Sequence, residues 1–394
     1  MKKTVSLLLA IVLLCSCIST FVSCSNGSTL HKINPTAEET QVVGTAGDYE
    51  ILYDELRCIT VNYREIMELK YGKGIWDNPE TAELYREELT NYVIAALSVN
   101  SAALTAAAKH GITPDDESVK DFVSIQLASL VGELTELIKL DHTEENFVPS
   151  SSMLNNYYRQ FLTENHLSDR YNRFVMSVDG CIDALRVKLL RDGSLPSDDD
   201  SVKAFVNENF VHVFHVWLPF NQYADTDAAK QDAELVSWIL KTNLLTESNR
   251  IQLREKLNIT NTNADTSTVR LYNRLIDAIT PDDKMNVMVG SIYNKDTAIS
   301  KYGYYFSYGE YSKSYETAAF ALEEGEISDP VLDGSGYYVI YRLPLDQTYV
   351  DKNLDLLKSQ YESAYINGLV EAEQSKISFI FNDFGRSLDL TKIK

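Results

Sequence analysis

Apolar residues follow a helical spacing through most of the first half of the chain. Before this spacing begins, the apolar residues of 42–52 predict a short strand or hairpin. Gly111 and Gly193 end two of the helical stretches, because glycine readily takes the left-handed conformation of a helix stop. The helices predicted by this spacing are residues 56–67, 79–108, 113–140, 153–165, 168–190 and 196–209. The pattern therefore predicts a mostly helical domain over residues 42–209.

At Phe210 the spacing changes to every second residue. Residues 210–218 are the best strand candidate in the chain, and residues 336–343 form a later strand rich in aromatic and β-branched side chains. Helical spacing returns between these strands, at residues 228–245 and 248–257, and the polar stretch 258–268 is typical of an inserted loop. The sequence therefore predicts a second, mixed domain over residues 210–346.

The last apolar pattern predicts a tail helix that has no partner nearby in the sequence. Residues 351–383 carry Leu354, Leu357, Tyr361 and Tyr365 at helical spacing. A helix with a wide apolar face needs a surface to cover, and the helical domain is the nearest one. The predicted fold is thus α+β, with an α+β domain inserted into a helical domain that residues 347–394 complete.

The N-terminus has the build of an export signal. Lys2 and Lys3 precede an apolar run at residues 5–14, which is shorter than the roughly 20 residues of a membrane-spanning helix. The segment ending in Cys24 resembles a bacterial lipoprotein signal, which implies removal of residues 1–23 and a lipid on Cys24. Cys17 fits the same pattern, and an ordinary signal peptide is a third interpretation. Residues 24–41 would be a flexible tether, and the protein would be extracytoplasmic and anchored to the bacterial cell membrane by its lipid.

Length, charge and cysteine use narrow the class of protein. A chain of 394 residues exceeds the roughly 250–300 at which single cores stop growing, so more than one domain is expected. With 57 acidic against 36 basic residues and a formal net charge of −21, its surface is unsuited to nucleic acid. Cys58 and Cys181, outside the leader, are too far apart for a CxxC motif, and Cys58 is expected to be a buried thiol. The six histidines show no metal-ligand spacing, so no metal site is expected.

Several segments of the mixed domain follow the order of a known family. They are His215-Val216-Trp217-Leu218 at the end of the first strand, the stretch from Tyr293 to Thr297, and the run from Phe306 to Tyr341. On these segments the chain resembles extracytoplasmic foldases of the PrsA and SurA type, which join a helical chaperone domain to a parvulin-type peptidyl-prolyl cis-trans isomerase domain. The resemblance implies unfolded exported polypeptides as partners and a reaction that needs no cofactor. Residues 248–288 do not align with the family.

The resemblance also implies site residues. The implied catalytic positions are His215, Asp296, Ser335 and Tyr338, and the implied substrate-binding positions are Phe306, Tyr311 and Tyr315. Tyr338 stands where the family has a second histidine, and Tyr311 and Tyr315 replace the methionine and phenylalanine of its proline pocket.

These tyrosines change what the site is expected to do. A buried hydroxyl without a partner costs about 1–3 kcal/mol, so we expect the tyrosines to bond to one another or to His215 and to narrow the pocket. The sequence therefore predicts weak or absent isomerase activity together with intact binding of unfolded chains. The alternatives are an active isomerase, a chaperone that keeps the fold without catalysis, and a solute-binding lipoprotein. The last is disfavoured by the lack of repeated βα units.

Overall fold

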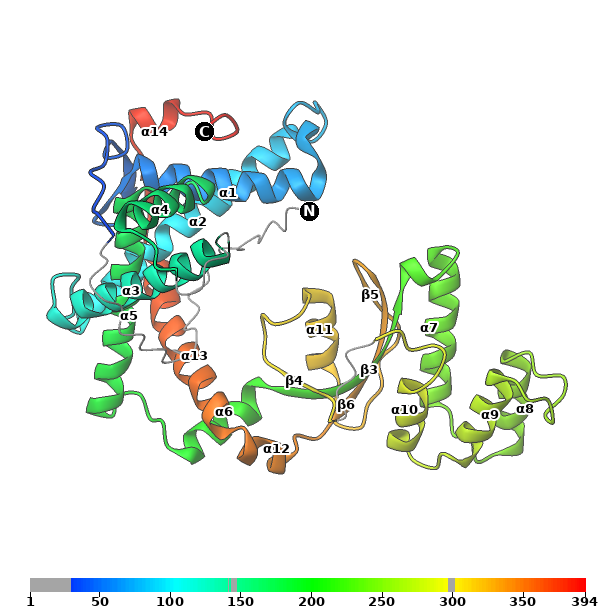
Figure 1. Ribbon diagram of the computed structural model, residues 1–394. Helices are drawn as coiled ribbons and strands as arrows, with labels where there is room; N and C mark the ends of the chain where they lie inside the picture. The colour runs from blue at the N-terminus through cyan, green and yellow to red at the C-terminus, as the bar shows by residue number, and fades with distance from the viewer. Residues whose placement is uncertain (1–29, 141, 143–146, 297–301) are drawn as a thin grey trace. The chain divides into compact units, whose positions relative to one another are not determined.

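The computed structural model describes residues 30–140, 142, 147–296 and 302–394 of the chain, which form two compact units (Figure 1). Unit 1 is Met1–Ser197 with Ser359–Lys394, and unit 2 is Asp198–Lys358. The predicted fold class, an α+β part inserted into a helical part, is therefore confirmed. The predicted domain limits at 209/210 and 346/347 stay a prediction. The leader with Cys17 and Cys24 lies outside the described residues.

Unit 1 is mostly helical, with one small antiparallel sheet in the order β2-β1-β7. Its strands are β1 (Val42–Ala46), β2 (Tyr49–Leu52) and β7 (Phe379–Phe381). Its helices are α1 (Tyr53–Tyr71), a 3-10 helix at Lys73–Trp76, α2 (Ala82–Lys109), α3 (Glu117–Leu140), α4 (Ser151–Glu164), α5 (Asp169–Asp192), most of α13 (Leu354–Gln374), and α14 (Asp383–Ser387). The predicted hairpin at residues 42–52 is confirmed as β1 and β2.

The C-terminal segment is built into both the core and the sheet of unit 1. Ile366 and Val370 of α13 are 1% and 2% exposed and pack among buried residues of α2 and α5. β7 pairs with β1, where a Cβ on Gly44 would lie 2.5 Å from the carbonyl oxygen of Ile380, so glycine permits this close approach. The predicted return of the tail helix is confirmed. The prediction of one continuous helix over residues 351–383 is wrong. The helix is interrupted after α12 (Gln347–Lys352), and after Gln374 the chain leaves the helix and forms strand β7.

The core of unit 1 contains the apolar helix α2 and the thiol of Cys58. Within the described ranges, α2 alone is long and apolar enough to cross a membrane, and 56% of that apolar window is buried. Leu89, Val93 and Leu97 on this helix are fully buried in the core, so we interpret α2 as a core helix. Cys58 is 2% exposed, as expected, and burial raises the pKa of its thiol to about 12. Leu30, from the predicted tether, packs against the same core.

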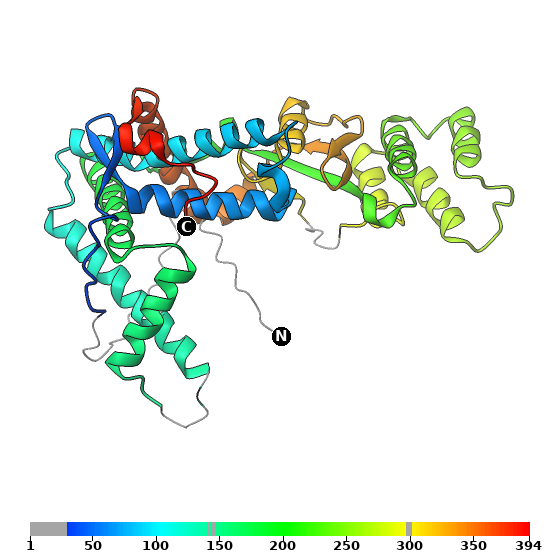
Figure 2. The same cartoon turned by 90° about the horizontal axis from the view of Figure 1, so that it is seen from above.

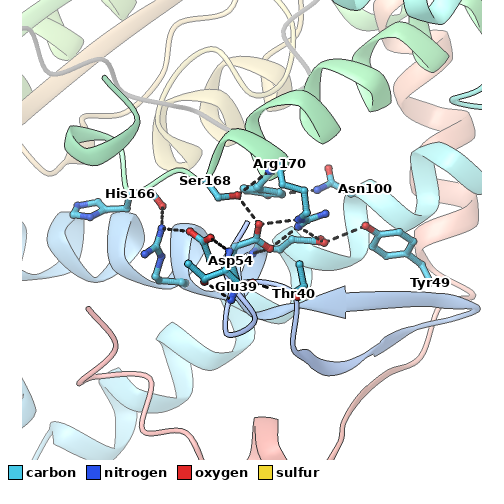
Figure 3. A network of polar contacts seen from close by, with 12 residues as sticks. Glu39, Thr40, Tyr49, Asp54, Asn100, His166, Ser168 and Arg170 are labelled. Carbon is cyan, nitrogen blue, oxygen red and sulfur yellow. Dashed lines mark hydrogen bonds and ion pairs between the residues drawn. The ribbon is translucent and has the colours of Figure 1, made fainter. Parts of the chain in front are cut away.

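A buried ionic cluster joins the start of α1 to the start of α5 (Figure 3). Asp54 and Glu55 are both fully buried, and the Arg170 guanidinium donates to both carboxylates, to Glu55 at 2.9 Å. The hydroxyls of Ser168 and Tyr49 add bonds to Asp54 and Glu55. Two carboxylates thus share one cation, and burial raises the pKa of Glu55 to about 7, against the opposing charge of Arg170.

Unit 2 has a four-stranded antiparallel sheet in the order β4-β3-β6-β5. Its strands are β3 (Val211–Pro219), β4 (Tyr304–Phe306), β5 (Val331–Asp333) and β6 (Gly336–Leu343). Its helices are α6 (Asp199–Asn209), a 3-10 helix at Phe220–Gln222, α7 (Thr226–Lys241), α8 (Glu247–Lys256), α9 (Ser267–Asp277), α10 (Pro281–Val289), α11 (Lys313–Ala321) and α12. The predicted strands at 210–218 and 336–343 and the loop at 258–268 are confirmed within one or two residues.

Alternation along β3 gives the sheet two apolar faces. Val211 and Val213 pack with residues of α11 and β4, while Val216 and Leu218 pack with α7 and α10. The three helices from the segment that does not align with the family, α8 to α10, bury their apolar residues in this second cluster. His215 lies on the α11 face of β3, so the fold directs the candidate site to that side of the sheet.

Candidate functional site

His215 is held in the middle of the sheet. It lies on β3 opposite Ile340 of β6, and the next pair on that face is Trp217 with Tyr338. The imidazole is 6% exposed, and its ring stacks on Tyr304 at a centroid distance of 4.5 Å with 8° between the planes. The sheet and the aromatic rings therefore fix the orientation of the imidazole.

Both ring nitrogens of His215 have partners. Nε2 lies 3.0 Å from Oδ2 of Asp296, and Nδ1 lies 2.8 Å from the hydroxyl of Tyr315. Because a carboxylate only accepts, Nε2–H donates to Asp296, and in the tautomer with its proton on Nε2 the Nδ1 atom accepts from Tyr315. The expected bond between a pocket tyrosine and His215 is confirmed for Tyr315. As a result, no hydrogen-bonding position on the imidazole is left for a substrate.

Asp296 is placed by a segment that runs beside β3. The backbone N–H of Lys295 donates to the carbonyl of Trp217 at 2.9 Å, and Oδ1 of Asn294 accepts from the N–H of Trp217 at 2.9 Å. The same Oδ1 accepts from the N–H of Asp296 at 3.3 Å. The Tyr304 hydroxyl then donates to Oδ2 of Asp296. The carboxylate therefore accepts from both the imidazole and a tyrosine.

The predicted substrate-binding residues differ in accessibility. Phe306 is fully buried and Tyr315 is 1% exposed, so these two fill the floor of the site. Tyr311 is 41% exposed, and its ring contacts Tyr315 at a centroid distance of 5.1 Å. Tyr338 is half-buried and meets the His215 ring edge-on at 5.1 Å. Among the aromatic candidates, Tyr311 and Tyr338 are thus the two that a ligand can reach.

Burial keeps the hydroxyls of these tyrosines protonated. It raises the pKa of Tyr315 well above its ordinary value, with smaller contributions from Tyr311 and Tyr338. Burial also raises the pKa of Tyr338, as does the charge of Asp333, while a hydrogen bond with Ser335 opposes the change. The site therefore contains neutral hydroxyl donors around one carboxylate.

Ser335 lies apart from the His215 and Asp296 pair. It is exposed in the turn between β5 and β6, where its carbonyl oxygen accepts from the N–H of Phe220 at 2.9 Å. Its link to the site is an effect on Tyr338, because Ser335 opposes the rise that burial causes in the pKa of that tyrosine. The geometry brings together six of the seven predicted positions and leaves Ser335 at the edge.

Tyr304 belongs to the site although the sequence did not indicate it. Its position on β4 lies opposite Val213, and Phe306 lies opposite Val211, so both side chains share the face of His215. The sequence signal that could have identified it is the two-residue spacing from Phe306, which was already a candidate, because side chains two residues apart on a strand lie on the same face. In the residues that the structure describes, no group of three His, Cys, Asp or Glu side chains could hold a metal ion.

Comparison with known proteins gives one match in sequence and weak matches in structure. No family model matches the chain. Foldase protein PrsA 1 of Bacillus cereus is 31% identical over 101 residues, which cover 23% of this chain and 35% of that protein. The chain thus spans about a third of the length of this curated relative.

Two solved structures illustrate the weaker likeness. A peptidylprolyl isomerase (PrsA) of Bacillus anthracis is 16% identical, with 70% of this chain and 94% of that chain covered and a TM-score of 0.29. A SurA-like chaperone of Campylobacter jejuni is also 16% identical, with 62% and 91% covered and a TM-score of 0.16. TM-scores this low do not establish a common arrangement. The similarity to the Bacillus cereus protein confirms the resemblance to PrsA-type foldases that the sequence segments predicted.

Proposed function

We propose that the protein is an extracytoplasmic folding factor that binds non-native exported polypeptides, and that its α+β unit has weak or no prolyl isomerase activity. The observation that carries the proposal of weak or absent isomerase activity is that both ring nitrogens of His215 already have hydrogen-bond partners, Asp296 and Tyr315. The family resemblance supports the chaperone class, and the leader supports export. Cys24 is the proposed site of the lipid anchor.

Prolyl isomerisation sets a clear physical demand on such a site. Rotation about the prolyl bond crosses a barrier of roughly 18–20 kcal/mol, because amide resonance must be lost. A catalyst must bind the twisted amide better than the planar one, by gripping the ring and by offering polar groups to the amide. Here Phe306 and Tyr315 fill the floor, and the imidazole already has both partners. The remaining accessible groups, Tyr311 and Tyr338, offer aromatic surface for binding.

A prolyl isomerase assay on the unmodified protein and on a double variant of the candidate site tests the proposal. The unmodified protein is expected to leave the cis-trans rate of a proline tetrapeptide near its uncatalysed value. The double variant Tyr315→Phe with Tyr338→His frees Nδ1 of His215 and supplies a second imidazole, so it should accelerate the reaction. Binding of an unfolded model protein should stay unchanged. Tyr308→Phe with Tyr337→His, outside the His215 contacts, serves as the matched control.

The opposite outcome is equally clear. An unmodified protein as fast as a typical parvulin, whose rate disappears in His215→Ala, would make it an active isomerase. Failure to bind any unfolded polypeptide would remove the chaperone function, and a solute-binding lipoprotein would then be the better description.

Membrane attachment is tested separately. Cys24→Ala is expected to move the protein from the membrane fraction to the soluble fraction. Release that requires Cys17→Ala instead would place the lipid on the earlier cysteine, and retention in both variants would exclude a lipid anchor at either position.

A further inference from the structure

The hairpin of α1 and α2 in unit 1 carries apolar side chains that its own core does not use. The two helices run side by side, as the blue and cyan ribbons of Figure 2 show. Leu69 is 89% exposed, Leu84 63% and Ile66 41%. Buried residues such as Leu89 and Val93 already pack this hairpin against the core. Exposed apolar side chains gathered in this way mark an interaction surface.

Helical geometry arranges these side chains in two ridges. Tyr63, Ile66 and Leu69 follow one another at every third residue of α1, and Leu84 and Tyr92 lie on one row of α2 at multiples of four. The two ridges meet where the rings of Tyr63 and Tyr92 stack at 3.5 Å with 7° between their planes. We call these five residues, Tyr63, Ile66, Leu69, Leu84 and Tyr92, the tyrosine face.

A second aromatic pair extends the tyrosine face toward the tip of the hairpin. Tyr71 and Tyr85 contact each other at a centroid distance of 5.0 Å, and Tyr71 is 39% exposed. Paired tyrosine rings offer a large contact area at little cost in conformational entropy. The hairpin is thus suited to flexible chains that present apolar side chains in no fixed arrangement.

Acidic side chains outnumber basic ones along this hairpin. Between Asn62 and Tyr92 the sequence has seven acidic and four basic side chains. Glu88 lies between Leu84 and Tyr92 on the same row, and its carboxylate accepts from the hydroxyl of Tyr63 at 3.3 Å. The ammonium of Lys70 lies over the Tyr71 ring at 4.6 Å, so a ring of this hairpin already accepts a cation. Acidic side chains beside aromatic rings favour a basic partner.

We infer that the tyrosine face binds apolar segments of non-native polypeptides that carry lysine or arginine. This inference rests on the proposed function and names the class of client that the helical unit prefers. Aliphatic side chains of the client cover Ile66, Leu69 and Leu84, and its cations lie against the tyrosine rings and the neighbouring carboxylates.

Two peptides and two double variants of the full chain test the inference. The peptides share one unstructured apolar sequence, with lysines in one and glutamates in the other. The unmodified protein should bind the lysine peptide more tightly, and added salt should weaken that binding. Leu69→Gln with Leu84→Gln removes apolar surface without adding charge and should weaken binding of the lysine peptide about tenfold.

The matched control uses two equally exposed apolar residues of α3. Ile125 and Leu140 are 64% and 82% exposed, and Ile125→Gln with Leu140→Gln should leave the affinity unchanged. Equal binding of both peptides, or equal loss in both double variants, would overturn the inference while chaperone binding stands. If the unmodified chain binds neither peptide and no unfolded protein, the proposed function itself fails.

Discussion

Each unit buries a carboxylate-centred cluster, but the two clusters satisfy their charge differently. In unit 1, Asp54 and Glu55 share the guanidinium of Arg170, which bridges helices far apart in the sequence. In unit 2, Asp296 accepts from an imidazole and a tyrosine hydroxyl. An ionic cluster fixes the position of its elements, and losing its cation leaves buried charge. A cluster in which hydroxyl groups supply donors loses less when one hydroxyl is removed, so it tolerates changes such as the tyrosines at the candidate site.

The largest expected effect comes from removing the shared cation. Arg170→Met leaves two buried carboxylates without a counter-charge and should lower the free energy of unfolding of unit 1 by about 3–5 kcal/mol. Urea denaturation followed by hydrogen exchange in each unit measures the loss. Arg270→Met, which breaks an exposed pair with Asp265, should change stability by less than about 1 kcal/mol. Equal effects of the two changes would remove the distinction between the clusters.

The pH dependence of unit 1 should depend on Glu55. The pKa of this carboxyl is raised from 4.5 to about 7 in the folded state, so folding favours its protonated form. Its contribution is therefore fully present below about pH 4.5 and is lost as pH rises through about 7, a difference of roughly 3 kcal/mol. Glu55→Gln keeps the neutral form at every pH. Relative to the unmodified protein, this variant should gain stability in denaturant titrations between pH 5 and pH 8, and parallel pH curves would contradict the prediction.

A smaller effect is expected in unit 2. Tyr315→Phe removes the hydroxyl that donates to Nδ1 of His215 and should cost about 1–3 kcal/mol. The loss should be confined to unit 2 in hydrogen exchange, and the nitrogen chemical shifts of His215 should change. Tyr308→Phe, on a ring that is 64% exposed, is the control and should be neutral. A neutral Tyr315→Phe would mean that the hydroxyl adds nothing to the cluster.

Local patterns predicted the parts of the fold that depend on neighbouring residues. Alternation at residues 210–218 gave β3, and with it the face that His215 occupies. Tyr311 and Tyr315 were candidates from the family resemblance. The cost of a buried hydroxyl predicted that the tyrosines would bond to one another or to His215, and Tyr315 bonds to His215.

Contacts between residues that are far apart in the sequence gave no comparable local pattern. β7 has three residues, too few to show alternation, and its partner Gly44 precedes it by most of the chain. The bond from Arg170 to Asp54 spans 116 positions, and nothing near either residue in the sequence indicates it. Tyr304 reaches Asp296 by sharing a sheet face, which required the register of β4 on β3.

The insertion of unit 2 has a consequence for how this chain can change in evolution. The chain enters unit 2 through α6 and β3 and leaves through β6 and α12, and these strands are antiparallel neighbours with His212 opposite Leu343. An ion pair of 2.7 Å between Lys203 and Asp351 joins the two connecting helices. Because the points of entrance and departure lie side by side, one deletion or duplication in the gene can remove or replace the whole unit without redirecting the rest of the chain. A lineage can therefore lose the α+β unit and keep the helical one.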